Sequence, residues 1–147
     1  MRLRFPHRAL LALAASLASL ACSPAARERL REHTYPPSFN YITQEQLHSA
    51  MWQLAEHSAQ LDRLMREPGG GDEPLQARVI LELGEMERAA AVLGPGGWPS
   101  NHPLVSRNID RFRQDLADAR HAAELDPPVY FLAGSVSGAC MQCHGGD

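Results

Sequence analysis

The sequence contains no lysine, and all 14 of its strongly basic residues are arginine. This absence excludes chemistry that needs a lysine amine, such as Schiff-base catalysis or a phosphate-binding P-loop. The arginines form no basic run, and the formal charge is -3 at pH 7. A surface that binds nucleic acid is basic, so no nucleic-acid partner is expected.

Aromatic residues are also scarce, at 6% of the chain. No window alternates Val, Ile, Thr or aromatic residues with polar ones, as a half-buried strand would. The 147 residues are enough for one globular domain and too few for two. The chain length excludes a multidomain enzyme, and the lack of strand patterns favours a single all-helical domain.

The N-terminus has the composition of an export signal. Three arginines precede an apolar run over residues 9–21, which ends at Cys22. This run is shorter than the roughly 20 residues that a membrane-spanning helix needs, and it fits the apolar core of a signal peptide. Residues 1–21 are therefore predicted to be a signal peptide, and the protein is expected in the periplasm.

Cys22 directly follows Leu20 and Ala21, an arrangement that resembles the lipobox of bacterial lipoproteins. The resemblance implies that Cys22 is acylated and anchors the mature N-terminus to a membrane facing the periplasm. The alternative is ordinary signal cleavage near Ala21 or Ala26, which leaves a soluble periplasmic protein. Residues 22–40 contain several prolines and no apolar periodicity, so they are expected to form a flexible tether.

From residue 41 onward, apolar residues recur with the 3.6-residue period of amphipathic helices. Four such segments are separated by proline and glycine clusters, which end helices. Thr43 and Gln46 have the spacing of a capping box, Asp72 and Asn101 are predicted N-caps, and Pro74 and Pro103 fall in first turns. The inward stripes are Leu47, Met51, Leu54, Ser58, Leu61 and Met65; Leu75, Val79, Leu83, Met86, Ala90 and Leu93; Val105, Ile109, Phe112, Leu116, Ala119 and Ala123; and Leu132, Val136, Ala139, Cys140 and Cys143. Residues 41–147 are thus predicted to form an all-α, antiparallel up-down-up-down four-helix bundle.

The last helix carries the chemical motif of the chain. Cys140, Cys143 and His144 form C-x-x-C-H, the attachment sequence of c-type haem. Two thiols three residues apart on a helical turn face the same side, so both can form thioethers with one haem. His144 is then placed to be the proximal iron ligand. The motif predicts a single covalent haem c near the C-terminal helix.

Three other interpretations of the two cysteines are open. A thioredoxin-like redox pair would need a βαβ context, which an all-helical pattern lacks. A zinc site would need further ligands. A disulfide between residues three apart would close almost no loop and so stabilise the fold little. Export favours haem, because haem c is attached outside the cytoplasm.

A four-helix domain with a single C-x-x-C-H in its last helix resembles the class II cytochromes c, the cytochrome c′ group. The resemblance covers residues 41–147 and implies that Cys140 and Cys143 hold the haem and that His144 is its proximal ligand. It also implies that helix one presents a residue to the distal face of the haem, and Met51 falls at that place. A homodimer through helices one and two is permitted by the resemblance but not required.

Met51 is the candidate distal ligand on its own merits, because it lies on the inward stripe and a thioether is a soft ligand suited to haem iron. The alternatives are an unliganded distal contact or simple core packing. His48 and His57 flank the same stripe and are the rival ligands. The remaining core-domain and tether histidines are expected at the surface: His33, His102 and His121.

Other residues are expected to contact the haem without a chemical role. Tyr130 and Phe131 precede the haem cysteines and are expected to pack at the porphyrin edge or in the ordinary core. Met86 and Phe112, from the two middle stripes, are similar candidates.

The expected function is one-electron transfer by a periplasmic monohaem cytochrome that turns over no substrate. Its partner would be an unidentified redox protein with a basic surface, because the chain is acidic. The alternative is a five-coordinate haem protein that binds nitric oxide or carbon monoxide for sensing or protection. A third hypothesis is a zinc or redox-thiol protein without haem.

Overall fold

The computed structural model describes residues 23–66 and 74–145. The predicted signal peptide, the acylation site Cys22 and the predicted cap Asp72 lie outside these ranges. The chain divides into two units, residues 1–37 and residues 38–147. The second unit begins close to the predicted domain boundary at residue 41. Among the described helices, none is long and apolar enough to cross a membrane.

The first unit contains helix α2, Pro24–Thr34. The expectation of a flexible tether over residues 22–40 is therefore wrong for this stretch. Ser23 caps the helix, since its Oγ accepts a hydrogen bond of 3.1 Å from the backbone N–H of Ala26. Proline in the first turn and a sequence rich in Ala, Arg, Glu and Leu also favour helix, even without an apolar face.

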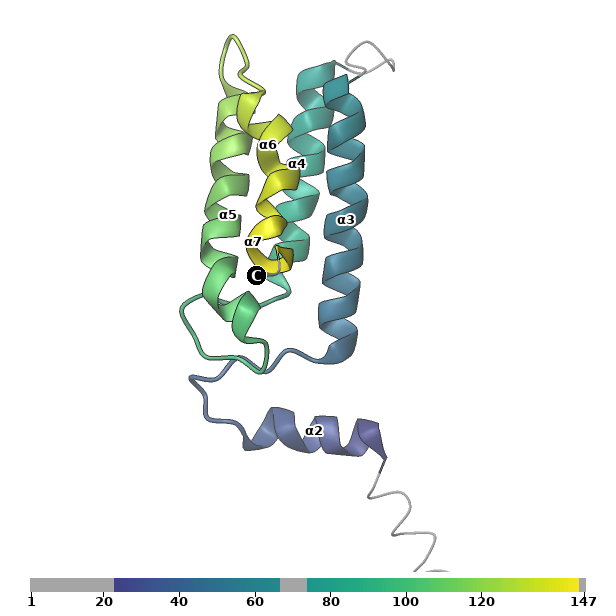
Figure 1. Ribbon diagram of the computed structural model, residues 1–147, viewed down its shortest axis with the longest axis vertical. Coiled ribbons are helices and arrows are strands. Elements are labelled where there is room, and N and C mark those ends of the chain that lie inside the picture. The colour runs from purple at the N-terminus through teal and green to yellow at the C-terminus, as the bar shows by residue number, and fades with distance from the viewer. Residues whose placement is uncertain (1–22, 67–73, 146–147) are drawn as a thin grey trace, which may run out of the picture. The chain divides into compact units, whose positions relative to one another are not determined.

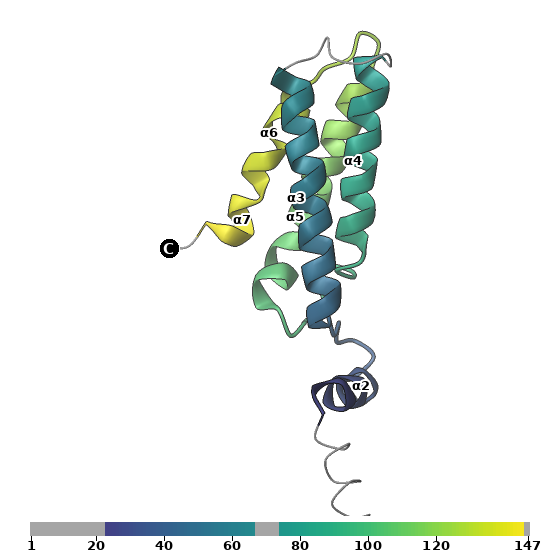
Figure 2. The same ribbon diagram turned by 90° about the vertical axis from the view of Figure 1, so that its right-hand side faces the viewer.

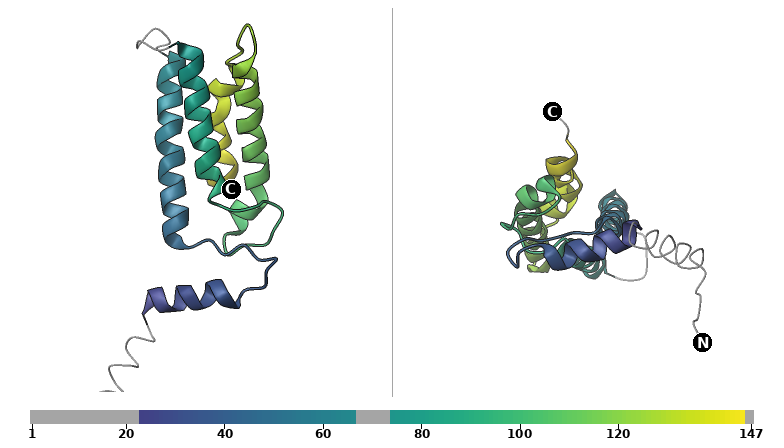
Figure 3. Two further views of the ribbon diagram at one scale, coloured as in Figure 1. Left: turned by 180° about the vertical axis from the view of Figure 1, so that it is seen from behind. Right: turned by 90° about the horizontal axis from the view of Figure 1, so that it is seen from below.

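The second unit is a bundle of helices α3 (Gln44–Arg66), α4 (Leu75–Ala91), α5 (Pro103–Glu124) and α6 (Phe131–Ala139), followed by the short α7 (Met141–His144). Helix α4 packs against α3 and α5, and α6 packs against α5 and α3, which closes the ring (Figure 1). From behind, α4 is seen between α3 and α5 (Figure 3). Within the described residues there is no strand, only an isolated bridge between Asn40 and Ser100. The all-helical prediction is confirmed.

The start of α3 is capped as predicted. The Thr43 N–H donates to Gln46 Oε1 at 2.9 Å, and the Gln46 N–H donates to Thr43 Oγ1 at 3.0 Å. This reciprocal pair is a capping box, which satisfies two backbone donors that the first turn leaves unpaired.

The starts of α4 and α5 differ from the prediction. Pro74 is the N-cap of α4 rather than a first-turn residue. His102, not Asn101, is the N-cap of α5, although Pro103 is in the first turn as expected. The Asn101 amide instead binds the backbone of Ile42, accepting from its N–H at 2.8 Å and donating to its carbonyl at 2.7 Å. Asn101 therefore ties the segment before α3 to the segment before α5.

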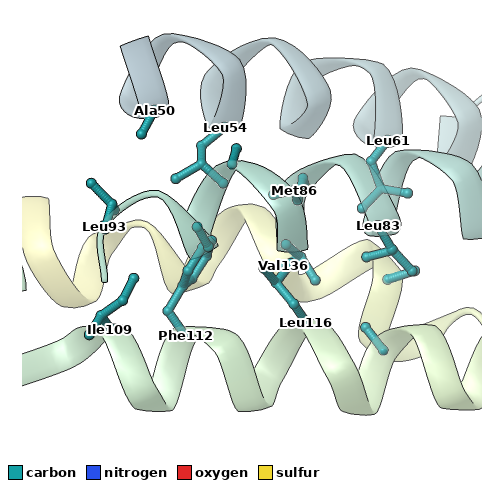
Figure 4. Packing of buried hydrophobic residues seen from close by; sticks show 14 of the residues in the cluster. Ala50, Leu54, Leu61, Leu83, Met86, Leu93, Ile109, Phe112, Leu116 and Val136 are labelled. Carbon is teal, nitrogen blue, oxygen red and sulfur yellow. The ribbon is translucent and has the colours of Figure 1, made fainter. Parts of the chain in front are cut away.

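The core forms where the four helices meet. All six residues predicted on the α5 stripe are buried, and side chains of α3, α4, α5 and α6 point toward one another along the bundle (Figure 4). Ala50 and Leu64 on α3 are also buried, beyond the predicted stripe. On α6 the prediction of Leu132 is wrong: Leu132 is 38% exposed, and its neighbour Ala133 is buried. The α6 helix thus presents only small side chains to the core.

Substitution Leu83→Ala should lower the free energy of unfolding by about 2–5 kcal/mol, because it leaves a cavity in the core. Leu83 is fully buried, whereas Leu81 on the same helix is 52% exposed. Leu81→Ala is the matched control and should change stability by less than about 1 kcal/mol. Urea denaturation followed by circular dichroism measures both, and equal losses would contradict this core.

Substitution Asn101→Ala should lower stability by about 1–3 kcal/mol, because it leaves the N–H and carbonyl of Ile42 without their partner. Asn108→Ala is the control, since the Asn108 amide bonds only within its own helix, to the Leu104 carbonyl at 2.9 Å. Thermal unfolding of the two variants compares them. A similar melting temperature for both would show that the Asn101 bridge does not hold the bundle end.

Candidate functional site

An apolar cavity of about 310 Å³ lies between α3, α5 and the C-terminal turn. Small-molecule sites in proteins occupy about 300–1,000 Å³, so this space is large enough to be a ligand site. Its walls come from five segments: Met51, Leu54 and Ala55 of α3; Leu93 after α4; Val105, Ile109 and Phe112 of α5; Ala139 of α6; and Cys140, Cys143 and His144. The C-x-x-C-H motif therefore lines a cavity that is otherwise almost wholly apolar.

The turn that carries the motif keeps helical geometry although α6 and α7 are separate helices. Cys140 joins them with φ -59° and ψ -29°, and its carbonyl accepts from the N–H of Cys143 at 3.3 Å and of His144 at 3.1 Å. Both cysteines are free thiols and half-buried. Because they lie one turn apart, both reach the same cavity. Helix α7 packs against α5 and α6 and diverges from α3 (Figure 2).

Two polar contacts hold α7 against α5. The Gln142 amide donates to Asp115 Oδ2 at 3.0 Å, and Cys143 Sγ lies 3.9 Å from the Leu104 carbonyl oxygen. Gln142 Oε1 is buried and makes no hydrogen bond to any described residue. Gln142, between the two cysteines, therefore fixes the turn from the side that faces away from the cavity.

The environment of Cys140 favours its neutral form. Burial raises the pKa of the Cys140 thiol, a hydrogen bond with its own backbone opposes this, and the nearby Cys143 and Asp62 raise the pKa further. Near neutral pH the Cys140 sulfur is therefore held as a thiol rather than a thiolate.

The structure separates the candidate ligands of α3. Met51 lines the cavity and is half-buried. His57 does not line it, because its Nδ1 is 2.8 Å from Glu82 Oε2 of α4 in an ion pair if the ring is protonated. His48 is exposed and lines neither this cavity nor the second cavity described below. Of these three candidate ligands on α3, Met51 is thus the one that lines the cavity with the motif.

The expected aromatic and packing contacts hold only in part. Phe112 lines the cavity, whereas Met86 is buried in the core away from it. Tyr130 packs against the core, and Phe131 is 80% exposed, so the expected contact of Phe131 with a porphyrin edge is wrong. Both aromatic residues lie at the start of α6, and the motif lies beyond its other end.

One residue was missed in the sequence. His102, expected at the surface, lines a second cavity of about 250 Å³ together with Leu47, Met51, Cys143 and His144. The second cavity shares Met51, Val105, Cys143 and His144 with the first. The bundle topology could have indicated this position of His102. In an up-down bundle the third helix begins at the end where the fourth helix finishes, so His102 and the motif are expected at the same end.

The donor groups around the cavity are two thiols, a thioether and an imidazole. Within residues 23–66 and 74–145, no three His, Cys, Asp or Glu side chains are placed to hold one metal ion. A structural zinc site would need such a cluster. Haem c needs an apolar space, two thiols on one side and an imidazole beside them, and the cavity has these features.

No family model matches the chain, and no curated protein or solved structure matches it either.

Alkylation of the Cys140 thiol should need a higher pH in the folded, haem-free protein than in the chain unfolded in urea. The reactive species is the thiolate, and burial raises the pKa that controls its formation. The measurement is the rate of reaction with iodoacetamide against pH, in a chain that starts at residue 23 and carries Cys143→Ser. Coincident pH profiles for the folded and unfolded chains would refute the burial of Cys140.

Proposed function

We propose that this protein is a periplasmic monohaem cytochrome c that carries single electrons. Cys140 and Cys143 would hold one haem through thioether bonds, and His144 would be the proximal ligand. The observation that carries the proposal is the apolar cavity, whose lining includes the half-buried Cys140 and Cys143 and the exposed His144. The resemblance of the sequence pattern over residues 41–147 to the class II cytochromes c is a second reason for the proposal.

A bound haem would supply a one-electron couple, whose potential depends on its ligands and on burial. The side chains of the cavity set these conditions. Leu54, Ile109 and Phe112 would shield a bound haem from water and lower the local dielectric, and His144 would offer a nitrogen ligand. Cys140 and Cys143, held on one helical turn, would be the two points at which a haem is attached.

Met51 is the candidate sixth ligand, because it lines the same cavity as Cys140, Cys143 and His144. A ligating thioether favours electron transfer, since it fills the position that a gas would occupy. The alternative is an open haem that binds nitric oxide or carbon monoxide. The second cavity of about 250 Å³ beside Met51 favours this alternative, because it offers room for a small ligand.

The bundle order is part of the same proposal. We infer the antiparallel, up-down-up-down arrangement, which the α5–α6 connection supports. Residues 125–130 reach at most about 25 Å, whereas α5, with 22 residues, is about 33 Å long. Helix α6 must therefore start near the end of α5 and run back along it.

Location and partners extend the proposal to the rest of the chain. The signal-like residues 1–21 support export, and Cys22 supports a lipid anchor on a membrane facing the periplasm. The excess of acidic residues supports a redox partner with a basic surface. No substrate is turned over in this scheme.

The absorption spectrum of protein made with the haem attachment machinery tests the function. We expect a low-spin spectrum with an Fe–S(Met) charge-transfer band, little changed when carbon monoxide is added to the reduced protein. Met51→Ala should abolish that band. Met65→Ala is the control, because Met65 lies on the same helix and lines neither cavity.

A high-spin spectrum that shifts with carbon monoxide would instead place gas binding first and make Met51 a packing residue. A colourless protein would reject haem altogether and leave the redox-thiol or zinc hypothesis.

A further inference from the structure

A second cavity opens at the start of α5 and joins the proposed haem cavity. The two share Met51, Val105, Cys143 and His144, so a group that fills one also borders the other. His102, half-buried at the N-cap of α5, stands in the wall of the second cavity. Two ligand-type side chains, the thioether of Met51 and the imidazole of His102, therefore border the space next to His144.

The hydrogen bonds of His102 leave its ring free. Among the described residues, each of them uses the His102 backbone: its N–H donates to Ser100 Oγ at 3.0 Å, and its carbonyl accepts from Ser100 Oγ at 3.0 Å, from the Ser106 N–H at 3.0 Å and from Ser106 Oγ at 3.3 Å. The N-cap backbone is thus held by hydrogen bonds, and none of them involves the imidazole ring. Replacing the imidazole therefore removes none of the hydrogen bonds that position the turn.

The other histidines are not placed in this way. His57 is held by Glu82 on the α4 side of α3. His48 and His121 are exposed and border neither cavity. Apart from His144, His102 is the histidine of the described bundle that both lines a wall of these cavities and leaves its ring nitrogens available.

We infer that His102 is a second distal ligand, which takes the sixth position of the haem iron when the Met51 thioether is removed. The inference rests on the proposed haem function. A neutral imidazole offers a nitrogen lone pair and is a common ligand of haem iron, so the exchange needs no oxidant or reductant. The His102 imidazole would then replace the Met51 thioether as a ligand. Loss of Met51 alone would therefore leave no open position on the iron for a gas.

Two double variants test this inference against Met51→Ala. We expect Met51→Ala to lose the Fe–S(Met) band and to stay low-spin. Met51→Ala with His102→Ala should be high-spin and should bind carbon monoxide at least tenfold faster in the reduced state. Met51→Ala with His48→Ala is the matched control and should stay low-spin, because His48 borders neither cavity. The readouts are the absorption and electron paramagnetic resonance spectra of the oxidised proteins.

Haem content, measured by the pyridine haemochrome assay, distinguishes a failure of the His102 inference from a failure of the proposed haem function. If every protein contains haem but Met51→Ala is already as high-spin as the double variant with His102→Ala, the role of His102 is rejected and the haem function stands. If no protein contains haem, the proposed function itself fails. Equal helical content by circular dichroism shows that the variants are folded.

Discussion

The site depends on the shortness of helix α6 and on the few side chains that this helix buries. Helices α3, α4 and α5 are long and bury large side chains, whereas α6 buries only Ala133 and Val136. Beyond Val136, toward the C-terminal turn, no large side chain of α6 packs against the apolar faces of α3 and α5. A cavity therefore remains there. Exposed apolar surface costs about 25 cal/mol for each Å², so a flat apolar group seated there would complete the core.

Local patterns were sufficient for much of the bundle. The stripe of α5 and the capping box at Thr43 are correct, because helical periodicity and capping are set by residues three or four apart. Asn101 failed as a cap because its amide found partners on Ile42, which is distant in sequence. Helix α2 was missed because it forms from local propensity and capping, without the apolar face on which periodicity depends.

The site shows the same division. The motif residues Cys140, Cys143 and His144 could be named from their spacing, and Met51 from its position on a stripe, and all four line one cavity. Of the apolar wall residues, Phe112 was predicted as a haem contact, whereas Leu54, Val105 and Ile109 were predicted only as core. His102 could not be found from its neighbours in the chain, because its relation to Met51 and His144 arises when the start of α5 meets the end of the C-terminal turn.

Covalent attachment of haem to the C-terminal turn is the central claim, and the mass of the intact, denatured protein tests it most directly. The protein would be purified from a periplasm that contains the haem attachment machinery. The account predicts a mass that exceeds that of the processed chain, including any lipid on Cys22, by one haem, with no thiol left at Cys140 or Cys143. The mass of the chain alone, with both thiols free to react, would contradict it.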